Sequence, residues 1–264
     1  MPYVTANGIR LCYDEQGSGE PLLLIMGLGG NRLGWVPALS RFTDAYRCIT
    51  YDHRGTGQSD VPEGPYSIEQ FADDAAGLID ALGVGPVSCV GLSMGGSVLQ
   101  ALCYRHPQKV KKAVLLSTLP AYTEIQHAWL DALIALRQAG ADELALAVIG
   151  MPWGLTARTL ADHTKLIELA RLGLKNPYPT SPQAFALHGE AIRRYDSRPH
   201  LPEIKTPVLV LVGAEDVLTP AHQSIEMAQL IPGARLQIMP RGGHVGVFEY
   251  ADDYCAAIRA FLSS

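Results

Sequence analysis

Short apolar runs alternate along the chain with longer segments in which apolar residues recur every three or four positions. A short β-branched or leucine-rich run predicts a buried strand, and the helical spacing predicts amphipathic helices. Strands that alternate with helices favour a parallel sheet covered by helices on both faces. We therefore expect an α/β fold with six core strands, at about residues 22–26, 48–52, 87–93, 111–117, 207–213 and 235–240.

Local signals add detail to this pattern. Residues 67–83 show helical spacing and end at Gly83, and Ser67 with Gln70 forms a candidate capping box. Near the amino terminus, Asn7-Gly8 separates two short alternating runs, which is the signature of a β-hairpin. The hairpin would add two antiparallel strands and complete a mostly parallel, eight-stranded sheet.

Strand signals disappear between residues 120 and 201, where helical patterns take over. We expect residues 1–119 and 202–264 to form the core and residues 120–201 to form a helical cap, or lid, inserted between two strands. Trp129 and Trp153 lie in this insertion. They either face a pocket beneath the cap or form the small core of the cap itself, and the sequence leaves both interpretations open.

Composition restricts the class of protein. The chain has 264 residues, of which 48% are hydrophobic and 18% are charged, and its net charge is −5. These values fit a folded domain without the basic surface that nucleic-acid binding requires, and no apolar run approaches the roughly 20 residues of a membrane span. No signal peptide is visible and the five cysteines are scattered, so we expect a cytoplasmic protein with structural thiols.

The clearest chemical motif is G-x-S-x-G at Gly91 to Gly95, which follows a predicted strand and precedes a predicted helix. A serine on so tight a turn needs glycines two positions before and after it, because side chains there would collide with the backbone. The helix that follows presents free N–H groups to a developing negative charge. Ser93 is therefore a candidate nucleophile.

A serine nucleophile needs a general base and an acid that orients the base. Asp216 follows the predicted strand 207–213, and His244 follows the strand 235–240, so each lies on a loop after a strand. Glu215 is the nearest rival to Asp216, and we expect it to face solvent. The other seven histidines are expected to be surface or packing residues. For the oxyanion hole, we expect the backbone N–H groups of Leu28 and Met94.

With these motifs assembled, residues 3–262 resemble the α/β-hydrolase superfamily, and the opening segment together with residues 64–83 resembles its 3-oxoadipate enol-lactonase and small-esterase branch. The resemblance implies the α/β-hydrolase fold, a Ser-Asp-His triad and esterase or lactonase activity. It also implies that Asp52, Arg54 and Ser59 hold one another and neighbouring backbone near the site. One departure is Met26-Gly27, where the family usually has His-Gly, which suggests a more apolar wall beside the nucleophile.

We therefore expect a serine hydrolase that cleaves a small carboxylic ester or lactone without a metal or organic cofactor. The candidate substrate-binding residues are Met26, Trp129, Trp153 and Val245. Substrates of the enol-lactonase branch carry carboxylates, for which the insertion offers Arg158, Arg171, Arg193 and Arg194, although surface ion pairs also explain these arginines.

Other activities on the same triad remain open. They are C–C bond hydrolysis of a diketone, cofactor-free peroxidation, and reception of a small molecule for signalling. The sequence does not determine the oligomeric state.

Overall fold

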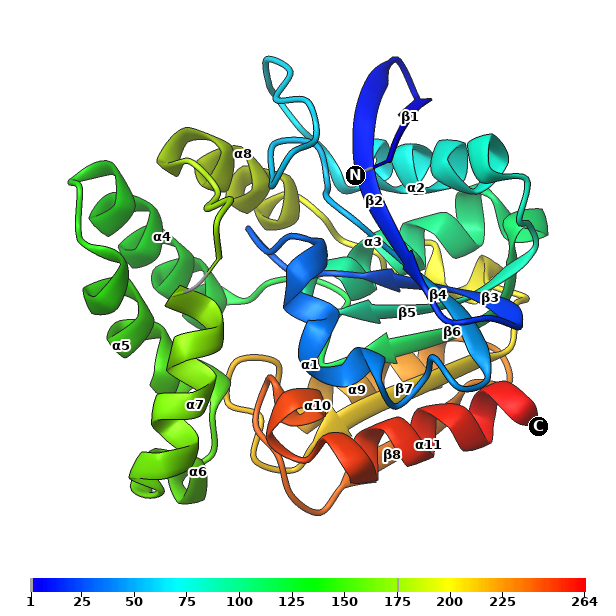
Figure 1. The fold of residues 1–264 in the computed structure, drawn as a ribbon. Coiled ribbons are helices and arrows are strands. Elements are labelled where there is room, and N and C mark those ends of the chain that lie inside the picture. Colours follow the sequence, from blue (N-terminus) through cyan, green and yellow to red (C-terminus); the bar gives the residue numbers. More distant parts are fainter. Residues whose placement is uncertain (1, 175) are drawn as a thin grey trace.

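The computed structural model describes residues 2–174 and 176–264, except for the side chains of residues 168 and 170–174. Eight strands form one sheet in the order β1-β2-β4-β3-β5-β6-β7-β8 (Figure 1). β1 and β2 pair antiparallel, as do β2 and β4, and all the other neighbours are parallel. The strands are β1 Tyr3–Ala6, β2 Ile9–Gln16, β3 Glu20–Ile25, β4 Tyr46–Tyr51, β5 Val87–Leu92, β6 Val110–Leu116, β7 Val208–Gly213 and β8 Arg235–Met239.

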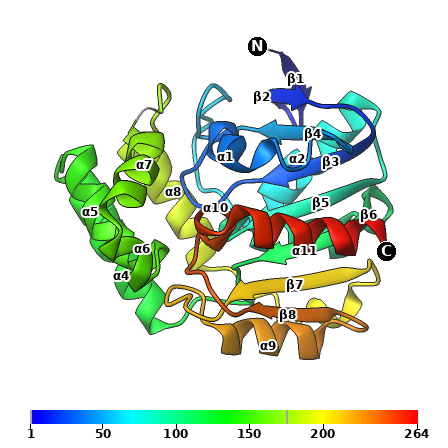
Figure 2. The same ribbon diagram turned by 60° about the horizontal axis from the view of Figure 1, so that its bottom comes forward.

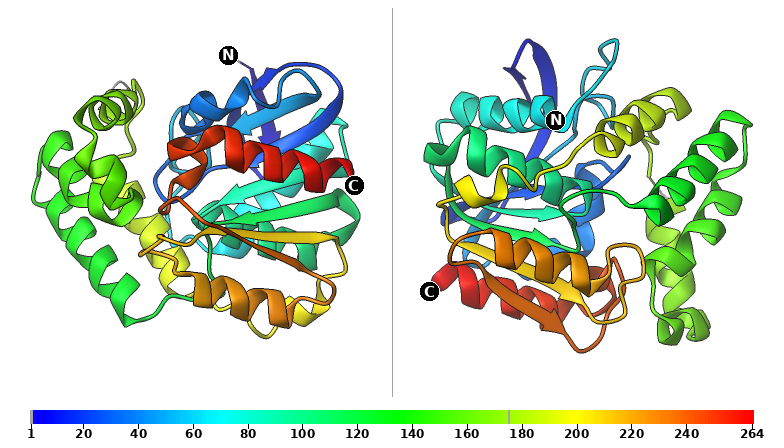
Figure 3. Two further views of the ribbon diagram at one scale, coloured as in Figure 1. Left: turned by 90° about the horizontal axis from the view of Figure 1, so that it is seen from below. Right: turned by 180° about the vertical axis from the view of Figure 1, so that it is seen from behind.

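Helices cover both faces of this sheet. The helices α2, α3 and α9 pack on one face, where Figure 3 (right) shows α2 in cyan and α9 in orange. The helices α1, α10 and α11 pack on the other face, and Figure 2 shows α10 and α11 in front of the sheet. Their bounds are α1 Val36–Leu39, α2 Ile68–Leu82, α3 Met94–Arg105, α9 Ala221–Leu230, α10 Gly246–Glu249 and α11 Ala251–Ser263.

Because helices cover both faces of the sheet, the core strands are continuous apolar runs in the sequence. Successive side chains of a strand point to opposite faces of the sheet. In β3, Leu23 and Ile25 contribute to the cluster beneath α2 and α3, whereas Leu22 and Leu24 contribute to the cluster beneath α11. Both layers are buried, so the expectation of a mostly parallel sheet with helices on both faces is confirmed.

The local signals also behave as expected. Asn7 and Gly8 have φ angles of 47° and 78° at the turn between β1 and β2, as a hairpin turn of this type requires. Ser67 and Gln70 form the reciprocal capping box at the start of α2, and Gly83 ends that helix in the left-handed region at φ 65°.

Among the described residues, five helices lie between β6 and β7, beyond the carboxyl ends of the parallel strands (Figures 1 and 3). They are α4 Glu124–Gln138, α5 Glu143–Gly154, α6 Ala157–Ala161, α7 His163–Leu174 and α8 Pro182–Arg193. The two ends of this insertion meet, because Ala121 and Asp196 form a β-bridge and Ser197 N donates to Pro120 O at 2.9 Å. Short 3₁₀ helices complete the fold at Arg32–Trp35, Pro107–Lys109 and Leu201–Glu203.

Candidate active site

Ser93 occupies the tight turn between β5 and α3. Its backbone is strained, with φ 57° and ψ −123°, a conformation that non-glycine residues rarely adopt. A Cβ atom at Gly91 would lie 2.3 Å from Gly95 O, and one at Gly95 would lie 2.3 Å from Ile25 O. Both glycines are therefore required by the close approach of the backbone, as the motif predicts.

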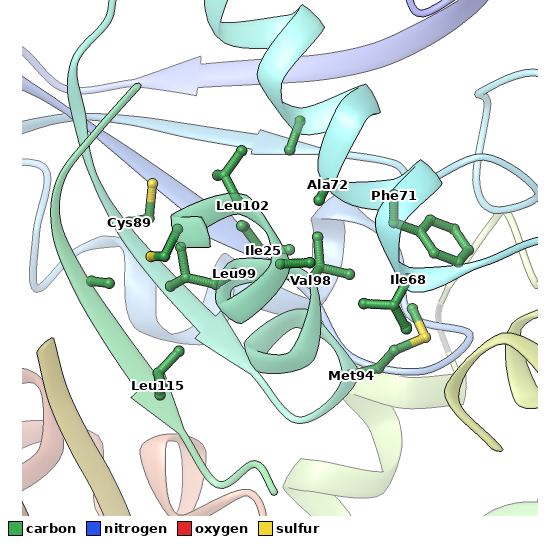
Figure 4. Packing of buried hydrophobic residues seen from close by; sticks show 14 of the residues in the cluster. Ile25, Ile68, Phe71, Ala72, Cys89, Met94, Val98, Leu99, Leu102 and Leu115 are labelled. Carbon is green, nitrogen blue, oxygen red and sulfur yellow. The ribbon is translucent and has the colours of Figure 1, made fainter. Parts of the chain in front are cut away.

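Met94, the next residue, begins α3. Its side chain belongs to the hydrophobic core, where Figure 4 shows it close to Ile68. Its backbone N–H stands at the first position of the helix, where no partner exists within the helix. The side chain of Met94 thus anchors the turn, while its N–H is available to an oxygen near Ser93.

The loop after β3 passes directly beside the nucleophile. A Cβ atom at Gly27 would lie 3.1 Å from Ser93 Cβ and 3.6 Å from Ser93 Oγ. Leu28 follows, and its N–H has no hydrogen-bond acceptor within the described part of the chain. The loop therefore brings a second unpaired donor, Leu28 N–H, to the vicinity of Ser93.

Asp216 and His244 are in contact at the ends of β7 and β8. His244 Nδ1 lies 3.1 Å from Asp216 Oδ2, and both side chains are buried. Asp216 Oδ1 accepts from Leu218 N at 3.0 Å and Thr219 N at 2.8 Å, which fixes the carboxylate. Glu215 is exposed, as expected.

Thr219 is a member of this group that sequence reasoning missed. Its hydroxyl donates to Asp216 Oδ2 at 2.7 Å and lies 3.1 Å from His244 Nδ1. The candidate acid and base are therefore held as a three-residue network. Ser93 Oγ makes no hydrogen bond within residues 2–174 and 176–264, so the contact between Ser93 and His244 is not formed in this state.

A second buried carboxylate braces the histidine loop. Glu249 is 4% exposed, and it accepts from Gly243 N at 2.8 Å and from Thr156 N and Oγ1 at 2.9 and 3.0 Å. Val245 N also donates to Gly154 O at 3.0 Å. Val245 is thus bonded directly to the segment that joins α5 and α6, and Gly243 is linked to that segment through Glu249, a connection that the sequence pattern did not reveal.

A cavity of about 620 Å³ lies between the core and the insertion. Met26 and Val245, two of the four candidate substrate-binding residues, are in its wall. Trp129 and Trp153 are not among its lining residues, and their rings lie beside each other, with centroids 6.4 Å apart and planes tilted by 52°. Because Met26 precedes Gly27 and Val245 follows His244, the cavity reaches the neighbourhood of the candidate triad.

Two histidines outside the candidate triad are buried where α8 meets the core. His53 Nε2 lies 2.9 Å from Met26 O, and His188 Nε2 lies 2.7 Å from Arg54 O. Burial lowers the pKa of His53 to about 4 and that of His188 to about 3. Both rings are therefore neutral at pH 7 and act as packing residues, the role that the sequence favoured.

The segment that begins at Asp52 forms two buried ion pairs. Asp52 pairs with Arg32 at 2.5 Å, and Ser59 Oγ donates to Asp52 O at 2.7 Å. Arg54 does not pair with Asp52, because it binds Asp74 on α2 at 2.7 Å. These contacts link the loop to helix α2 through Asp74 and to the start of the 3₁₀ helix Arg32–Trp35 through Arg32.

Two of the four arginines that the sequence offered for a substrate carboxylate pair with acidic neighbours instead. Arg193 pairs with Asp131 and with Glu190, and Arg194 pairs with Glu190 at 3.5 Å. Arg158 is exposed, and the side chain of Arg171 lies outside the described residues. Arg193 and Arg194 therefore take part in ion pairs with acidic residues at the surface.

Neither metal ligation nor a membrane span is evident in the described part of the chain. No cluster of three or more His, Cys, Asp or Glu side chains there could hold a metal ion. None of the described helices combines the length and apolarity needed to cross a bilayer. The five cysteines are free and buried.

The family model for the alpha/beta hydrolase fold matches residues 20–251. This chain belongs to that family. A Mycobacterium tuberculosis protein named non-heme bromoperoxidase BpoC is 30% identical over 97% of this hydrolase and 98% of the relative. A Caulobacter protein named carbamate hydrolase RutD is 31% identical over 92% and 91% of the two chains. The crystal structure of an enol-lactonase from Burkholderia xenovorans is similar with a TM-score of 0.87, 30% identity and full coverage of both chains.

Proposed function

We propose that this hydrolase cleaves a small carboxylic ester or lactone through an acyl-enzyme on Ser93. The observation that carries the proposal is the strained turn at Ser93, which lies against Gly27 with two unpaired backbone donors beside it. Similarity to an enol-lactonase and to a protein named as a carbamate hydrolase supports cleavage at an acyl carbon.

In the proposed reaction, Ser93 Oγ attacks the carbonyl carbon while His244 Nε2 takes the hydroxyl proton. Asp216 accepts from His244 Nδ1–H and stabilises the imidazolium that forms. The oxyanion of the tetrahedral intermediate accepts from the N–H groups of Leu28 and Met94, each worth about 3 kcal/mol in such sites.

The second half of the reaction repeats these roles. The alcohol leaves with the proton from His244, and a water molecule then attacks the acyl-enzyme with His244 again as the base. Catalytic hydrogen bonds in unliganded enzymes are often loose and tighten with substrate, which accounts for the open contact between Ser93 and His244. No metal or organic cofactor takes part in this scheme.

We also propose that residues 120–201 act as a cap over the site and that the core consists of residues 1–119 and 202–264. The location of α4–α8 beyond the carboxyl ends of the strands and the shared cavity support this division. Met26 and Val245 would contact substrate directly, whereas Trp129 and Trp153 would shape the cap. Five free thiols support a cytoplasmic location.

The test is hydrolysis of short-chain p-nitrophenyl esters and of small lactones by the wild type and by Ser93→Ala. Turnover that disappears in Ser93→Ala is expected, and equal rates in both proteins would contradict the proposal. Similarity to a protein named as a bromoperoxidase favours one second activity, the attack of hydrogen peroxide on the same acyl-enzyme. Peracid formation from an ester and hydrogen peroxide would reveal it.

A further inference from the structure

The segment between α7 and α8 runs along the loop that follows β3. Asn31 Nδ2 donates to Asn176 Oδ1 at 2.9 Å and to Tyr178 O at 3.0 Å. Thr180 Oγ1 donates to Gly29 O at 2.7 Å, and Thr180 is 8% exposed. The insertion is therefore hydrogen-bonded to the loop that holds one of the two candidate oxyanion donors.

This loop contains a tight turn. Gly30 N donates to Gly27 O at 3.0 Å, so Leu28 and Gly29 are the central residues of a four-residue turn. Gly29 has φ 65°, a left-handed conformation that favours glycine at the third position of a turn. A Cβ atom at Gly29 would also lie 2.6 Å from Phe185 Cδ2 on α8. Both the backbone angle and the packing of α8 therefore favour glycine here.

Two peptide groups of the turn are joined head to tail. Both are trans, so the carbonyl oxygen and the N–H of each group point in opposite directions. The peptide group between Gly29 and Gly30 accepts from Thr180 at its oxygen. Its N–H donates to the oxygen of the peptide group between Gly27 and Leu28. The N–H of that second group is the unpaired Leu28 N–H. A chain of hydrogen bonds thus runs from the Thr180 hydroxyl to the candidate oxyanion donor.

Such a chain affects both the direction and the strength of its last donor. Each hydrogen bond restrains the plane of one peptide group, so the two bonds together restrain the plane that holds Leu28 N–H. Hydrogen bonds linked in this way polarise one another and strengthen by about 10–30% each. Preorganised donors stabilise the charge that develops in the transition state. Loss of the first bond should therefore reduce the rate more than the affinity for substrate.

No second donor within the described residues replaces Thr180. Thr180 is the only hydrogen-bond partner of Gly29 O there, and the neighbouring Phe185 ring offers none. The start of the loop is held by the core instead, since His53 Nε2 lies 2.9 Å from Met26 O. The core thus restrains the beginning of the loop, whereas the insertion restrains the turn that follows.

We propose that Thr180 is a positioning residue, which aligns and polarises the Leu28 N–H through the two peptide groups of the turn. This inference rests on the proposed hydrolysis at Ser93, in which the Leu28 N–H donates to the oxyanion. Thr180 acts through the backbone and does not bind the reacting atoms itself. The insertion thereby gains a role in the chemical step besides covering the cavity.

The test compares Thr180→Val with wild type in the hydrolysis of p-nitrophenyl butyrate. Valine keeps the branched shape of threonine and lacks the hydroxyl. Loss of a complete oxyanion donor lowers kcat by about 10²–10³-fold, and this variant keeps the donor but loses its support. We therefore expect kcat to fall by about 5- to 30-fold. KM should stay within about twofold of wild type, as for an interaction made only in the transition state. Thr180→Ser keeps the hydroxyl and should restore most of the rate.

Inhibition by butylboronic acid gives a second readout. Its boron atom bonds a serine oxygen and becomes tetrahedral, so the adduct resembles the transition state and uses the oxyanion donors. The inhibition constant should rise in Thr180→Val by the factor by which kcat falls. A residue that only held the insertion in place would raise KM and lower Tm without this parallel change.

Ser181→Ala is the matched control in the same segment. Ser181 is exposed and caps α8 by accepting from Ala184 N at 3.2 Å, so its loss costs stability without removing a bond to the loop. Its kcat and its inhibition constant should equal those of wild type. If circular dichroism shows that Thr180→Val is not folded, Thr180→Ala takes its place in the comparison.

Failure of the inference and failure of the proposed hydrolysis give different results. Turnover by wild type above the Ser93→Ala rate, with kcat and the inhibition constant unchanged in Thr180→Val, would overturn the inference alone. A fall in kcat without a matching rise in the inhibition constant, or an equal fall in Ser181→Ala, would also overturn it. If wild type does not exceed the Ser93→Ala rate, the proposed hydrolysis is refuted and the role of Thr180 falls with it.

Discussion

The substitution Glu249→Gln replaces a buried carboxylate by an amide of nearly the same shape. The carboxylate accepts three hydrogen bonds, from Gly243 N and from the backbone and side chain of Thr156. An amide keeps one acceptor oxygen and turns the other acceptor into a donor. The amide N–H group of the glutamine would then point at another donor, either Gly243 N or Thr156, and neither donor would have an acceptor in this buried site.

The size of the effect follows from the number of bonds lost. A hydrogen bond to a charged group contributes about 1.5–3 kcal/mol, and a buried unpaired donor costs a similar amount. We expect the free energy of unfolding to fall by about 2–3 kcal/mol, and Tm to fall by about 5–10 °C for a chain of this size. Because Gly243 precedes His244, the proposed hydrolysis should also lose kcat while KM changes little.

Urea unfolding followed by circular dichroism measures the stability, and ester hydrolysis measures the rate. Glu215→Gln is the matched control, since Glu215 is exposed and accepts from Gly242 N on the same loop at only 3.4 Å. That variant should stay within about 0.5 kcal/mol of wild type. If Glu249→Gln behaved like Glu215→Gln in both assays, the bracing role assigned to Glu249 would be refuted.

Gly95→Ala should prevent native folding or lower Tm by more than 10 °C, measured by differential scanning fluorimetry, because its Cβ would lie 2.3 Å from a backbone carbonyl oxygen. Asp216→Asn should lower kcat by about 10³–10⁴-fold with far-UV circular dichroism unchanged, since an amide stabilises the wrong tautomer of His244. His53 and His188 hold their protons less tightly in the folded protein than in the unfolded chain, with pKa values of about 4 and about 3. Their contribution to stability is complete above the unfolded pKa near 6.5 and falls by about 1.4 kcal/mol per pH unit for each ring as the pH drops toward 4. His188→Phe should flatten this slope in urea titrations, and an unaltered slope would contradict the assignment.

The fold and the candidate nucleophile were readable from the sequence because each rests on a local requirement. A strand buried on both faces must be mainly apolar, and the buried parts of β3, β5 and β7 meet that condition. Ser93 needs Gly91 and Gly95 within two residues of it, since the turn admits no side chain there. Such requirements act over a few positions, so a single sequence displays them.

Asp216 and His244 could be chosen as candidates because the carboxyl ends of parallel strands lie at the same edge of a sheet. Residues after β7 and β8 must lie at the same edge as Ser93 after β5, whatever the helices between them do. The order of strands along the sheet was not needed. The contact of 3.1 Å between the two side chains agrees with that reasoning.

Only the tertiary structure placed Thr180 against Gly29, Thr219 between acid and base, and Glu249 against Thr156. Thr156 and Glu249 are 93 positions apart, and Gly29 and Thr180 are 151 positions apart. Within the insertion, the sequence offered Arg193 and Arg194, which the fold turns to acidic neighbours. Helical periodicity gives the face on which a side chain lies, but which element that face meets depends on long-range packing, and a single chain carries no local signal for it.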